Sequence, residues 1–203
     1  MCRTMAILAL IFALPLAVDA FDGQREGFLL SIGLGGAQRT IEESISPSEA
    51  PNIINPIKTT DLVTAYEMKI GYGLSNSLIV GLNINAANGT YQSKIFENPR
   101  STASFNITGL GLTYFFADRA PSLFIEAIFG MASWQYDIDD DGDSPLVSSG
   151  MACGLGYEFR KNWTLEIDAG WGSPKETTGI FAQLLGRQIE GLKLSLTAHH
   201  IWY

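Results

Sequence analysis

The chain has 203 residues, of which 17% are charged and 46% are hydrophobic, and it carries a net charge of −8. The low charged fraction excludes an intrinsically disordered chain and a coiled coil, which both need many charged positions. Only the N-terminal segment has an apolar run that approaches bilayer length, so a helical membrane bundle is excluded too. The acidic balance and the lack of a basic stripe argue against nucleic acid as a partner.

The N-terminus has the three parts of a secretory signal peptide. Arg3 provides the positive start, residues 5–18 form the apolar segment, and small or branched residues precede a cleavage point at Phe21. We therefore expect residues 1–20 to be a signal peptide and residues 21–203 to be the mature domain, which works outside the cytoplasm.

The mature chain alternates apolar residues with small or polar ones, which is the two-residue period of a β-strand. Near the C-terminus, for example, Leu192, Leu194 and Leu196 alternate with Lys193 and Ser195. Eight segments have this pattern: 28–35, 62–72, 78–85, 109–116, 123–131, 150–159, 163–171 and 192–197. Each predicted strand therefore has one apolar face and one face of glycine and polar residues, and no helix is expected after the signal peptide.

Short and long connections between these segments alternate along the chain. The short ones lie at Ser75-Asn76, at Asp118-Arg119-Ala120 and at Arg160-Lys161-Asn162, and the long ones run over about 41–60, 93–101, 138–144 and 173–190. This alternation puts all turns at one end of an up-and-down antiparallel sheet and all loops at the other. Aromatic residues recur at the turn end, once per predicted hairpin.

Two closed eight-stranded barrels are compatible with this pattern. A soluble lipocalin-like barrel has its apolar face inside, whereas a membrane barrel turns its apolar face to lipid and encloses the polar one. Three features favour the membrane barrel: glycines gather on the polar face, charges on that face are few and mixed in sign, and aromatic residues lie at strand ends.

The signal peptide and the eight alternating segments are accompanied by the runs GLGLTYFF (109–116) and CGLGYEFR (153–160) and by the terminal Ile201-Trp202-Tyr203. In these features the chain resembles the small outer-membrane β-barrels of Gram-negative bacteria, such as the OmpA transmembrane domain and OmpX. This resemblance implies an all-β, eight-stranded antiparallel up-and-down transmembrane β-barrel in the cell outer membrane. It also implies contact with outer-membrane lipid and lipopolysaccharide, and insertion by the barrel assembly machinery.

The same resemblance assigns an insertion signal to Ile201 and Tyr203, because the assembly machinery reads a terminal aromatic residue preceded by alternating apolar ones. Leu194 and Leu196 belong to the opposite phase of the alternation. We therefore expect a β-bulge near His199-His200 to bring the two phases into agreement.

The polar face of the predicted barrel contains eight residues able to form an interior network. They are Glu67, Lys69, Asn83, Glu126, Glu158, Glu166, Asp168 and Lys193. Because an eight-stranded barrel is just wide enough to be filled by side chains, carboxylates there must pair with cations. Structural ion pairing is the main interpretation, and a narrow, gated ion path is the alternative.

An acidic run in the third long loop is similar to the first half of a calcium-binding loop. Asp137, Asp139, Asp141 and Asp143 supply alternating carboxylates, but Ser148 stands where such a loop has its bidentate glutamate. The run is interpreted either as a solvated acidic loop or as a weak divalent-metal site, shared with lipopolysaccharide phosphates.

His199 and His200 are the only histidines in the chain. A lipid-modifying hydrolase needs a histidine together with a serine and an acid. The loop pattern places both histidines at the periplasmic end of the barrel, so we expect them to pack locally at the membrane interface. No catalytic residue and no cofactor is predicted.

These observations predict a monomeric, non-enzymatic outer-membrane barrel with a structural or interactive role. Envelope integrity, adhesion and binding of an unidentified extracellular ligand by the surface loops all fit this prediction. A narrow porin-like channel, an outer-membrane lipid-modifying enzyme and a soluble lipocalin-like carrier are the alternatives.

Overall fold

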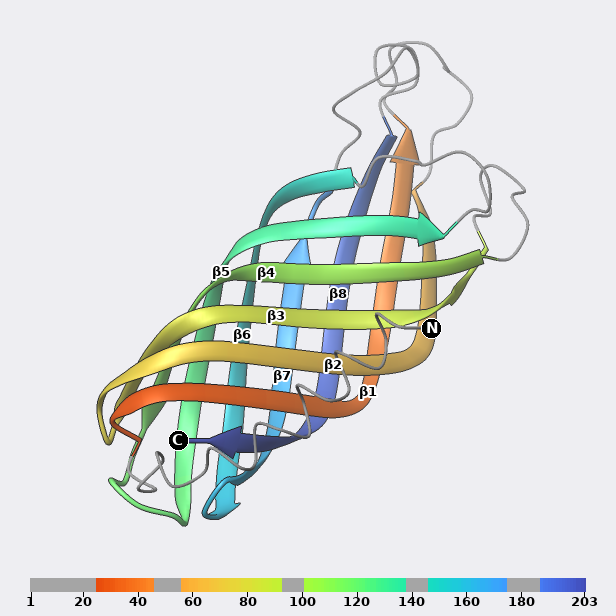
Figure 1. The fold of residues 1–203 in the computed structure, drawn as a ribbon. Helices are drawn as coiled ribbons and strands as arrows, with labels where there is room; N and C mark the ends of the chain where they lie inside the picture. The colour runs from red at the N-terminus through yellow and green to blue at the C-terminus, as the bar shows by residue number, and fades with distance from the viewer. Residues whose placement is uncertain (1–24, 46–55, 93–100, 138–145, 175–186) are drawn as a thin grey trace, which may run out of the picture.

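The computed structural model describes residues 25–45, 56–92, 101–137, 146–174 and 187–203 (Figure 1). The strands are β1 (Gly27–Ile45), β2 (Ile57–Ser75), β3 (Leu78–Tyr91), β4 (Ser101–Phe115), β5 (Ser122–Asp137), β6 (Leu146–Arg160), β7 (Trp163–Gly172) and β8 (Arg187–Trp202). The predicted signal peptide, residues 1–20, lies outside the described residues.

The strands form one closed antiparallel barrel in which each strand pairs with its neighbours in the sequence. β1 closes the sheet by pairing with β8, from Leu30 opposite Trp202 to Ile45 opposite Arg187. Closure gives every strand two hydrogen-bonded neighbours, which is what a sheet surrounded by lipid requires. The predicted eight-stranded up-and-down barrel is confirmed.

Within the described ranges, no helix has both the length and the apolar character needed to span a bilayer.

The outer face of the barrel is a continuous surface of exposed apolar side chains, which we call the outer apolar belt. Its members include Ile32, Leu34, Leu62, Met68, Ile70, Leu82, Ile84, Leu110, Leu112, Ile125, Phe129, Met131, Leu155, Leu165, Ile167, Leu192, Leu194 and Leu196. Leu110, for example, keeps 65% of its surface exposed. An apolar surface of this extent is incompatible with water and matches the lipid-facing side of a membrane barrel.

Several of the predicted turn-end aromatic residues lie on the outer face, whereas Phe115 and Tyr203 are buried inside. The exposed ones include Tyr72, Tyr114 and Tyr157. The ring of Trp163 packs against His200 at a tilt of 57°, with centroids 4.7 Å apart. Rings with one apolar and one polar side suit the level of the lipid headgroups.

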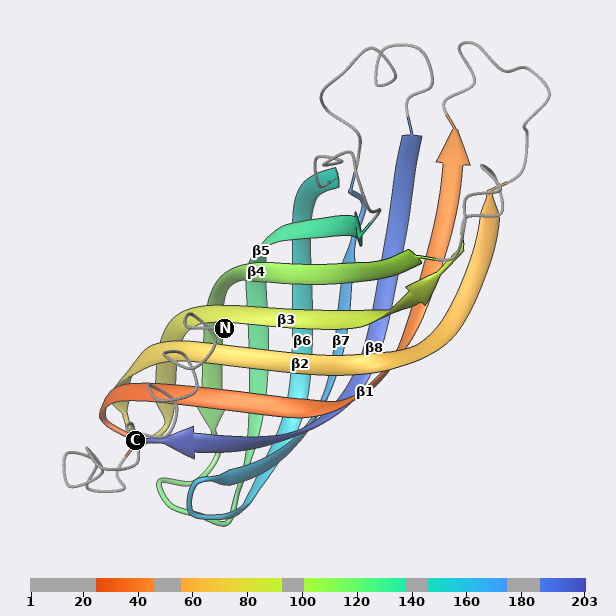
Figure 2. The ribbon, with the colours of Figure 1, turned by 45° about the vertical axis from the view of Figure 1, so that its right-hand side comes forward.

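Strands β1 and β2 are longer than the sequence pattern predicts. They have 19 residues each, so that residues 41–45 and 57–60 of the predicted loop 41–60 are strand. At about 3.3 Å per residue, 19 residues span roughly 60 Å, twice the hydrocarbon thickness of a bilayer. Figure 2 shows β1 and β8 continuing beyond the other strands at the end opposite the turns. There the outward residues become polar, as at Thr60 and Glu190, which made this part of the sequence look like a loop.

The interior is more apolar than predicted. Two groups of buried apolar side chains lie on either side of the polar residues. The turn-end layer contains Leu29, Ile79, Phe115, Phe124, Ile201 and Tyr203. The loop-end layer contains Ile41, Tyr91, Ala103, Phe105, Ile107, Ile128, Ala132, Trp134, Leu146, Ala152 and Ile189. The two-residue alternation identified the inward positions correctly, but it did not predict that so many of them carry large apolar side chains.

We expect Met68→Arg to destabilise the barrel in lipid vesicles by about 2–4 kcal/mol, because it puts a charge in the middle of the outer apolar belt. Thr60→Arg is the matched control, since it lies on the same strand and the same face but in the polar extension. It should cost no more than about 1 kcal/mol. Urea unfolding in vesicles measures both changes, and equal effects would contradict the assignment of the lipid-facing region.

Candidate functional site

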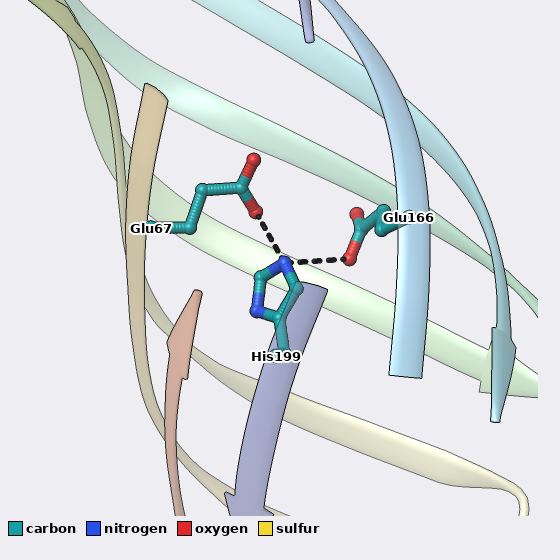
Figure 3. Close-up of side chains that lie close together, drawn as sticks. All are labelled: Glu67, Glu166 and His199. Carbon is teal, nitrogen blue, oxygen red and sulfur yellow. Dashed lines mark ion pairs between the residues drawn. The ribbon is translucent and has the colours of Figure 1, made fainter. Parts of the chain in front are cut away.

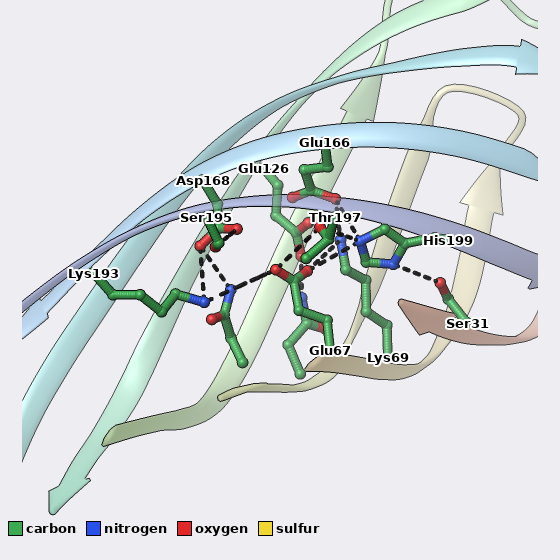
Figure 4. Close-up of polar contacts among 12 residues, drawn as sticks. Ser31, Glu67, Lys69, Glu126, Glu166, Asp168, Lys193, Ser195, Thr197 and His199 are labelled. Carbon is green, nitrogen blue, oxygen red and sulfur yellow. Dashed lines mark hydrogen bonds and ion pairs between the residues drawn. The ribbon is translucent and has the colours of Figure 1, made fainter. Parts of the chain in front are cut away.

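A layer of polar side chains crosses the barrel between the two apolar layers (Figure 4). It contains seven of the eight residues predicted for the interior network: Glu67 and Lys69 on β2, Asn83 on β3, Glu126 on β5, Glu166 and Asp168 on β7, and Lys193 on β8. Asn85, Ser31, Ser195, Thr197 and His199 complete it. We refer to this set as the polar layer.

Lys69 is the centre of the polar layer. Its Nζ donates hydrogen bonds to Oε2 of Glu126 and, at 2.7 Å, to Oε2 of Glu166. Glu126 also accepts a hydrogen bond from the amide of Asn83. The ammonium group therefore joins β2 to β5 and β7, across the inside of the barrel.

A second group of contacts surrounds Asp168. Asn85 donates hydrogen bonds to Glu67 Oε1 at 3.1 Å and to Asp168 Oδ1 at 2.9 Å. Ser195 donates to Asp168 Oδ2, and Lys193 Nζ lies 3.2 Å from Asp168 Oδ1. The side chains of both Lys193 and Asp168 are buried, which makes this a desolvated ion pair supported by hydrogen bonds.

His199 belongs to the polar layer, contrary to the prediction that it packs at the membrane interface. Its Nε2 lies 3.2 Å from Glu67 Oε2 and 3.6 Å from Glu166 Oε2, and its Nδ1 lies 3.2 Å from Ser31 Oγ. Figure 3 shows the imidazole between the two carboxylates, each side chain coming from a different strand. Only His200 lies at the interface, against Trp163.

The expected β-bulge near His199-His200 is wrong, because β8 keeps a regular register with both β1 and β7 through these residues. The phase set by Leu194 and Leu196 therefore continues to the end of the strand. It turns Ile201 and Tyr203 inward, where both are buried in the turn-end layer. Whether these two residues act as an insertion signal stays a prediction.

Glu158 is the one predicted network residue that lies apart from the polar layer. It pairs with the buried Arg25, which precedes β1 and was not predicted to be inside. The guanidinium carbon of Arg25 lies 3.8 Å from the ring centroid of Phe115, and Tyr203 Oη donates to Glu158 at 3.5 Å. This pair therefore holds the turn-end layer together.

A further ion pair lies at the loop end, between the buried Arg39 on β1 and the partly exposed Asp61 on β2. The two nitrogens Nε and Nη2 donate to the two carboxylate oxygens at 3.1 and 2.5 Å, in the bidentate arrangement that arginine favours. The side chain of Arg39 also donates to the carbonyl of Ala103 at 2.8 Å and lies over the ring of Trp134. Neither residue was among the predicted network members.

Glycines make room for the polar layer. A Cβ at Gly33 would lie 2.4 Å from the His199 ring, and one at Gly111 would lie 2.5 Å from the Asn83 amide. Such distances are far below van der Waals contact, so a side chain at either position would displace the polar residue beside it. The inward glycines recognised in the sequence therefore have a defined steric role.

The acidic run of the third long loop lies mostly outside the described residues. Asp137 ends β5, while Asp139, Asp141 and Asp143 fall in the undescribed range 138–145. The weak divalent-metal site proposed for this run stays a prediction.

Ser31, His199 and Glu67 form a buried trio with the composition of a hydrolytic triad. Beside it lies a cavity of about 20 Å³, lined by Ser31, Lys69, His199 and apolar residues of the turn-end layer. This volume holds about one water molecule. The cavity beside the trio is therefore too small for an acyl chain or a sugar.

A larger depression of about 440 Å³ lies on the outer wall. It is lined by Gly36, Gln38, Leu62, Val63, Ile167, Leu194 and Leu196, among others. The exposed leucines belong to the outer apolar belt, so this depression opens toward the lipid side of the wall.

We expect Asn85→Leu to lower the free energy of unfolding by about 3 kcal/mol, because it removes hydrogen bonds from two buried carboxylates. Asn106→Leu is the control, since Asn106 lies on the outer face of β4 and bonds only serine hydroxyls. Unfolding in detergent or lipid should show little change for this variant. A large loss for Asn106→Leu and none for Asn85→Leu would contradict the importance of the polar layer.

The barrel is similar to several solved structures of other proteins. No protein-family model and no curated protein matches the chain. Among solved structures, AlkL in lipid bilayers matches with a TM-score of 0.53 at 13% identity, over 88% of this chain and 91% of that one. OprG of Pseudomonas aeruginosa matches with a TM-score of 0.52 at 10% identity, over 90% and 99%.

Ail, the attachment invasion locus protein of Yersinia pestis, matches with a TM-score of 0.51 at 13% identity, over 87% of this chain and 99% of that one. All three similar proteins are small outer-membrane barrels. At such low identity the likeness shows the fold alone. The chain therefore has the fold of the eight-stranded outer-membrane β-barrels, in agreement with the location predicted from its sequence.

Proposed function

We propose that the protein is a rigid, non-enzymatic outer-membrane barrel whose surface loops make its functional contacts, in adhesion or ligand binding and in envelope integrity. The observation that carries this proposal is the filled interior. Two apolar layers enclose the polar layer, so the barrel wall serves as a scaffold and the loop end is left for interaction.

The filled interior argues against the channel alternative. An ion crossing the barrel would have to pass Phe115 and Phe124, whose rings pack 4.9 Å apart in the turn-end layer, and then the Lys69 ion pairs. At the loop end it would have to pass the buried Trp134 and Phe105. Opening such a path means displacing several packed side chains at once.

The enzyme alternative finds little support for the same reason. Ser31 and His199 are each 1% exposed, and the cavity beside them is about the size of one water molecule. A lipid substrate has no space to reach the serine oxygen. A general base needs its substrate within hydrogen-bond reach, and nothing larger than water fits there.

The sequences of the long connections favour a cationic partner, or one bridged by cations. Over 46–55, 93–100, 138–145 and 175–186 there are seven acidic residues and three basic ones. Ail has been solved in complex with sucrose octasulfate, a heparin analogue. The acidic loops of this chain would repel such a sulfated ligand, so we infer a different ligand chemistry on a similar scaffold.

Lipid is the other partner in this proposal. The outer apolar belt and the depression lined by Leu62, Leu194 and Leu196 suit acyl chains of outer-membrane lipid and lipopolysaccharide. The barrel assembly machinery would insert the chain, and the closed pairing of β1 with β8 supports a monomer, because it leaves no sheet edge for a second copy.

We expect Lys69→Met to lower the thermal stability of the purified barrel strongly while leaving its conductance near zero, because the apolar layers remain in place. Heat-dependent migration on a gel measures the stability, and planar-bilayer recording measures the conductance. A large, steady conductance of the wild-type protein would overturn the scaffold proposal.

We expect replacement of the four long connections by short glycine-serine linkers to abolish attachment of expressing cells to cultured host cells, with the barrel still folded. The control replaces residues 118–120 at the turn end, which face the periplasm under this proposal. Attachment is counted by microscopy, and folding is checked by heat-dependent migration. Undiminished attachment after loop replacement would contradict a role of the loops.

A further inference from the structure

We propose that Glu67, Glu166 and His199 form a buried binding site for a divalent first-row transition-metal ion, for which Zn²⁺ is the natural test ion. Among the described residues, these three side chains bring their ligand atoms within 4.8 Å of one another (Figure 3). They come from β2, β7 and β8, so a bound ion would link three strands of the barrel next to its β1–β8 closure.

The two distances from the imidazole nitrogen to the carboxylate oxygens suit a tetrahedral ion. Bonds of about 2.0–2.1 Å from Zn²⁺ to nitrogen and oxygen imply ligand-to-ligand distances of about 3.3–3.5 Å. The observed distances from His199 Nε2 are 3.2 Å to Glu67 Oε2 and 3.6 Å to Glu166 Oε2. Thr197 Oγ1, 2.8 Å from Nε2, offers a further oxygen. One imidazole and two carboxylates favour Zn²⁺ or a neighbouring metal over Ca²⁺ and Mg²⁺, which prefer oxygen ligands.

Ser31 orients the imidazole for this role. Its Oγ lies 3.2 Å from His199 Nδ1, on the opposite side of the ring from the two carboxylates. When Nδ1 carries the hydrogen and donates it to Ser31, Nε2 presents its lone pair to the carboxylates. A second hydrogen-bond partner of this kind is typical of metal-binding histidines.

The charges of the polar layer also favour a cation. Four carboxyl groups, those of Glu67, Glu126, Glu166 and Asp168, face the two ammonium groups of Lys69 and Lys193. When all four are ionised and His199 is neutral, the layer has an excess of two negative charges, which either two protons or one divalent ion would neutralise. Buried charges without compensation are costly.

Glu67 provides a separate indication of a ligand. The Glu67 side chain is only 1% exposed, and its Oε2 accepts no hydrogen bond. This oxygen points at His199 Nε2, which lies between the two carboxylates (Figure 3). A carboxylate oxygen and an imidazole nitrogen at 3.2 Å need either a hydrogen or a metal ion between them.

The competing occupants are a proton on Nε2, donated to Thr197, and the ammonium group of Lys69, which lies 2.7 Å from the same Glu166 oxygen. These alternatives give opposite results in Lys69→Met. Removing a like charge beside a metal site should tighten Zn²⁺ binding by at least about tenfold. Without a metal site, the same change only destabilises the barrel.

The apolar layers above and below the site determine how the experiment is done. The mature chain is unfolded in urea and refolded in detergent, either with micromolar Zn²⁺ or with a chelator, and metal is then measured after gel filtration. We expect one Zn²⁺ per folded chain that a chelator removes only slowly, and a higher unfolding temperature than that of the metal-free barrel. Co²⁺ in place of Zn²⁺ should give the intense visible absorption of a tetrahedral site.

Glu67→Gln and His199→Gln should fold with little or no bound Zn²⁺. Glu158→Gln is the matched control, because it alters a buried carboxylate of the turn-end layer and should keep the metal. Lys69→Met should be destabilised in chelator and restored by Zn²⁺. If the folded wild-type protein retains no Zn²⁺ and no Co²⁺ after refolding with either ion, the proposal fails, whatever the variants do. It also fails if Glu67→Gln and His199→Gln retain as much metal as the wild type.

Discussion

The interaction on which the interior depends is the contact of the Lys69 ammonium group with Glu126 and Glu166. It connects opposite walls of the barrel in a region with lipid outside and little water inside. In such a medium each partner is costly without the others, so the three side chains are stable only together. The polar layer is thus a consequence of one cation placed among several carboxylates.

Steric requirements follow from this charge arrangement. The long side chains of Lys69, Glu126 and Glu166 meet near the barrel axis, which leaves no volume for side chains on the strands behind them. A Cβ at Gly154 would lie 2.5 Å from Glu166 Oε1, just as one at Gly33 would meet His199. Glycines on the inner face therefore lie beside large polar side chains, which occupy the space that a Cβ would need. This explains why glycine is enriched on the inner face of a barrel whose interior is filled.

Much of this architecture could be predicted from the sequence, because a two-residue period defines which side chains share a face. It placed Glu67, Lys69 and Glu166 inside correctly. It failed where further assumptions were added. The loop pattern put His199 at the membrane interface and a bulge was expected beside it, whereas the unbroken phase from Leu194 turns His199 inward. No periodic pattern could have identified Arg25 as an interior residue, because it precedes β1 and its position depends on the ion pair with Glu158.

The alternation put Phe115 and Phe124 on the inner face, opposite Tyr114 and Leu123, and the structure agrees. It could not show that such inward aromatic side chains would gather into apolar layers on either side of the polar residues. Inward aromatic side chains exclude water from both ends of the polar layer, which strengthens every electrostatic contact inside it. The ion pair of Arg39 with Asp61 lies toward the loop end, where β1 and β2 extend well beyond the length a bilayer requires. The wall is thereby held rigid up to the strand ends that lead into the loops, and a rigid base reduces the conformational entropy that a loop loses on binding.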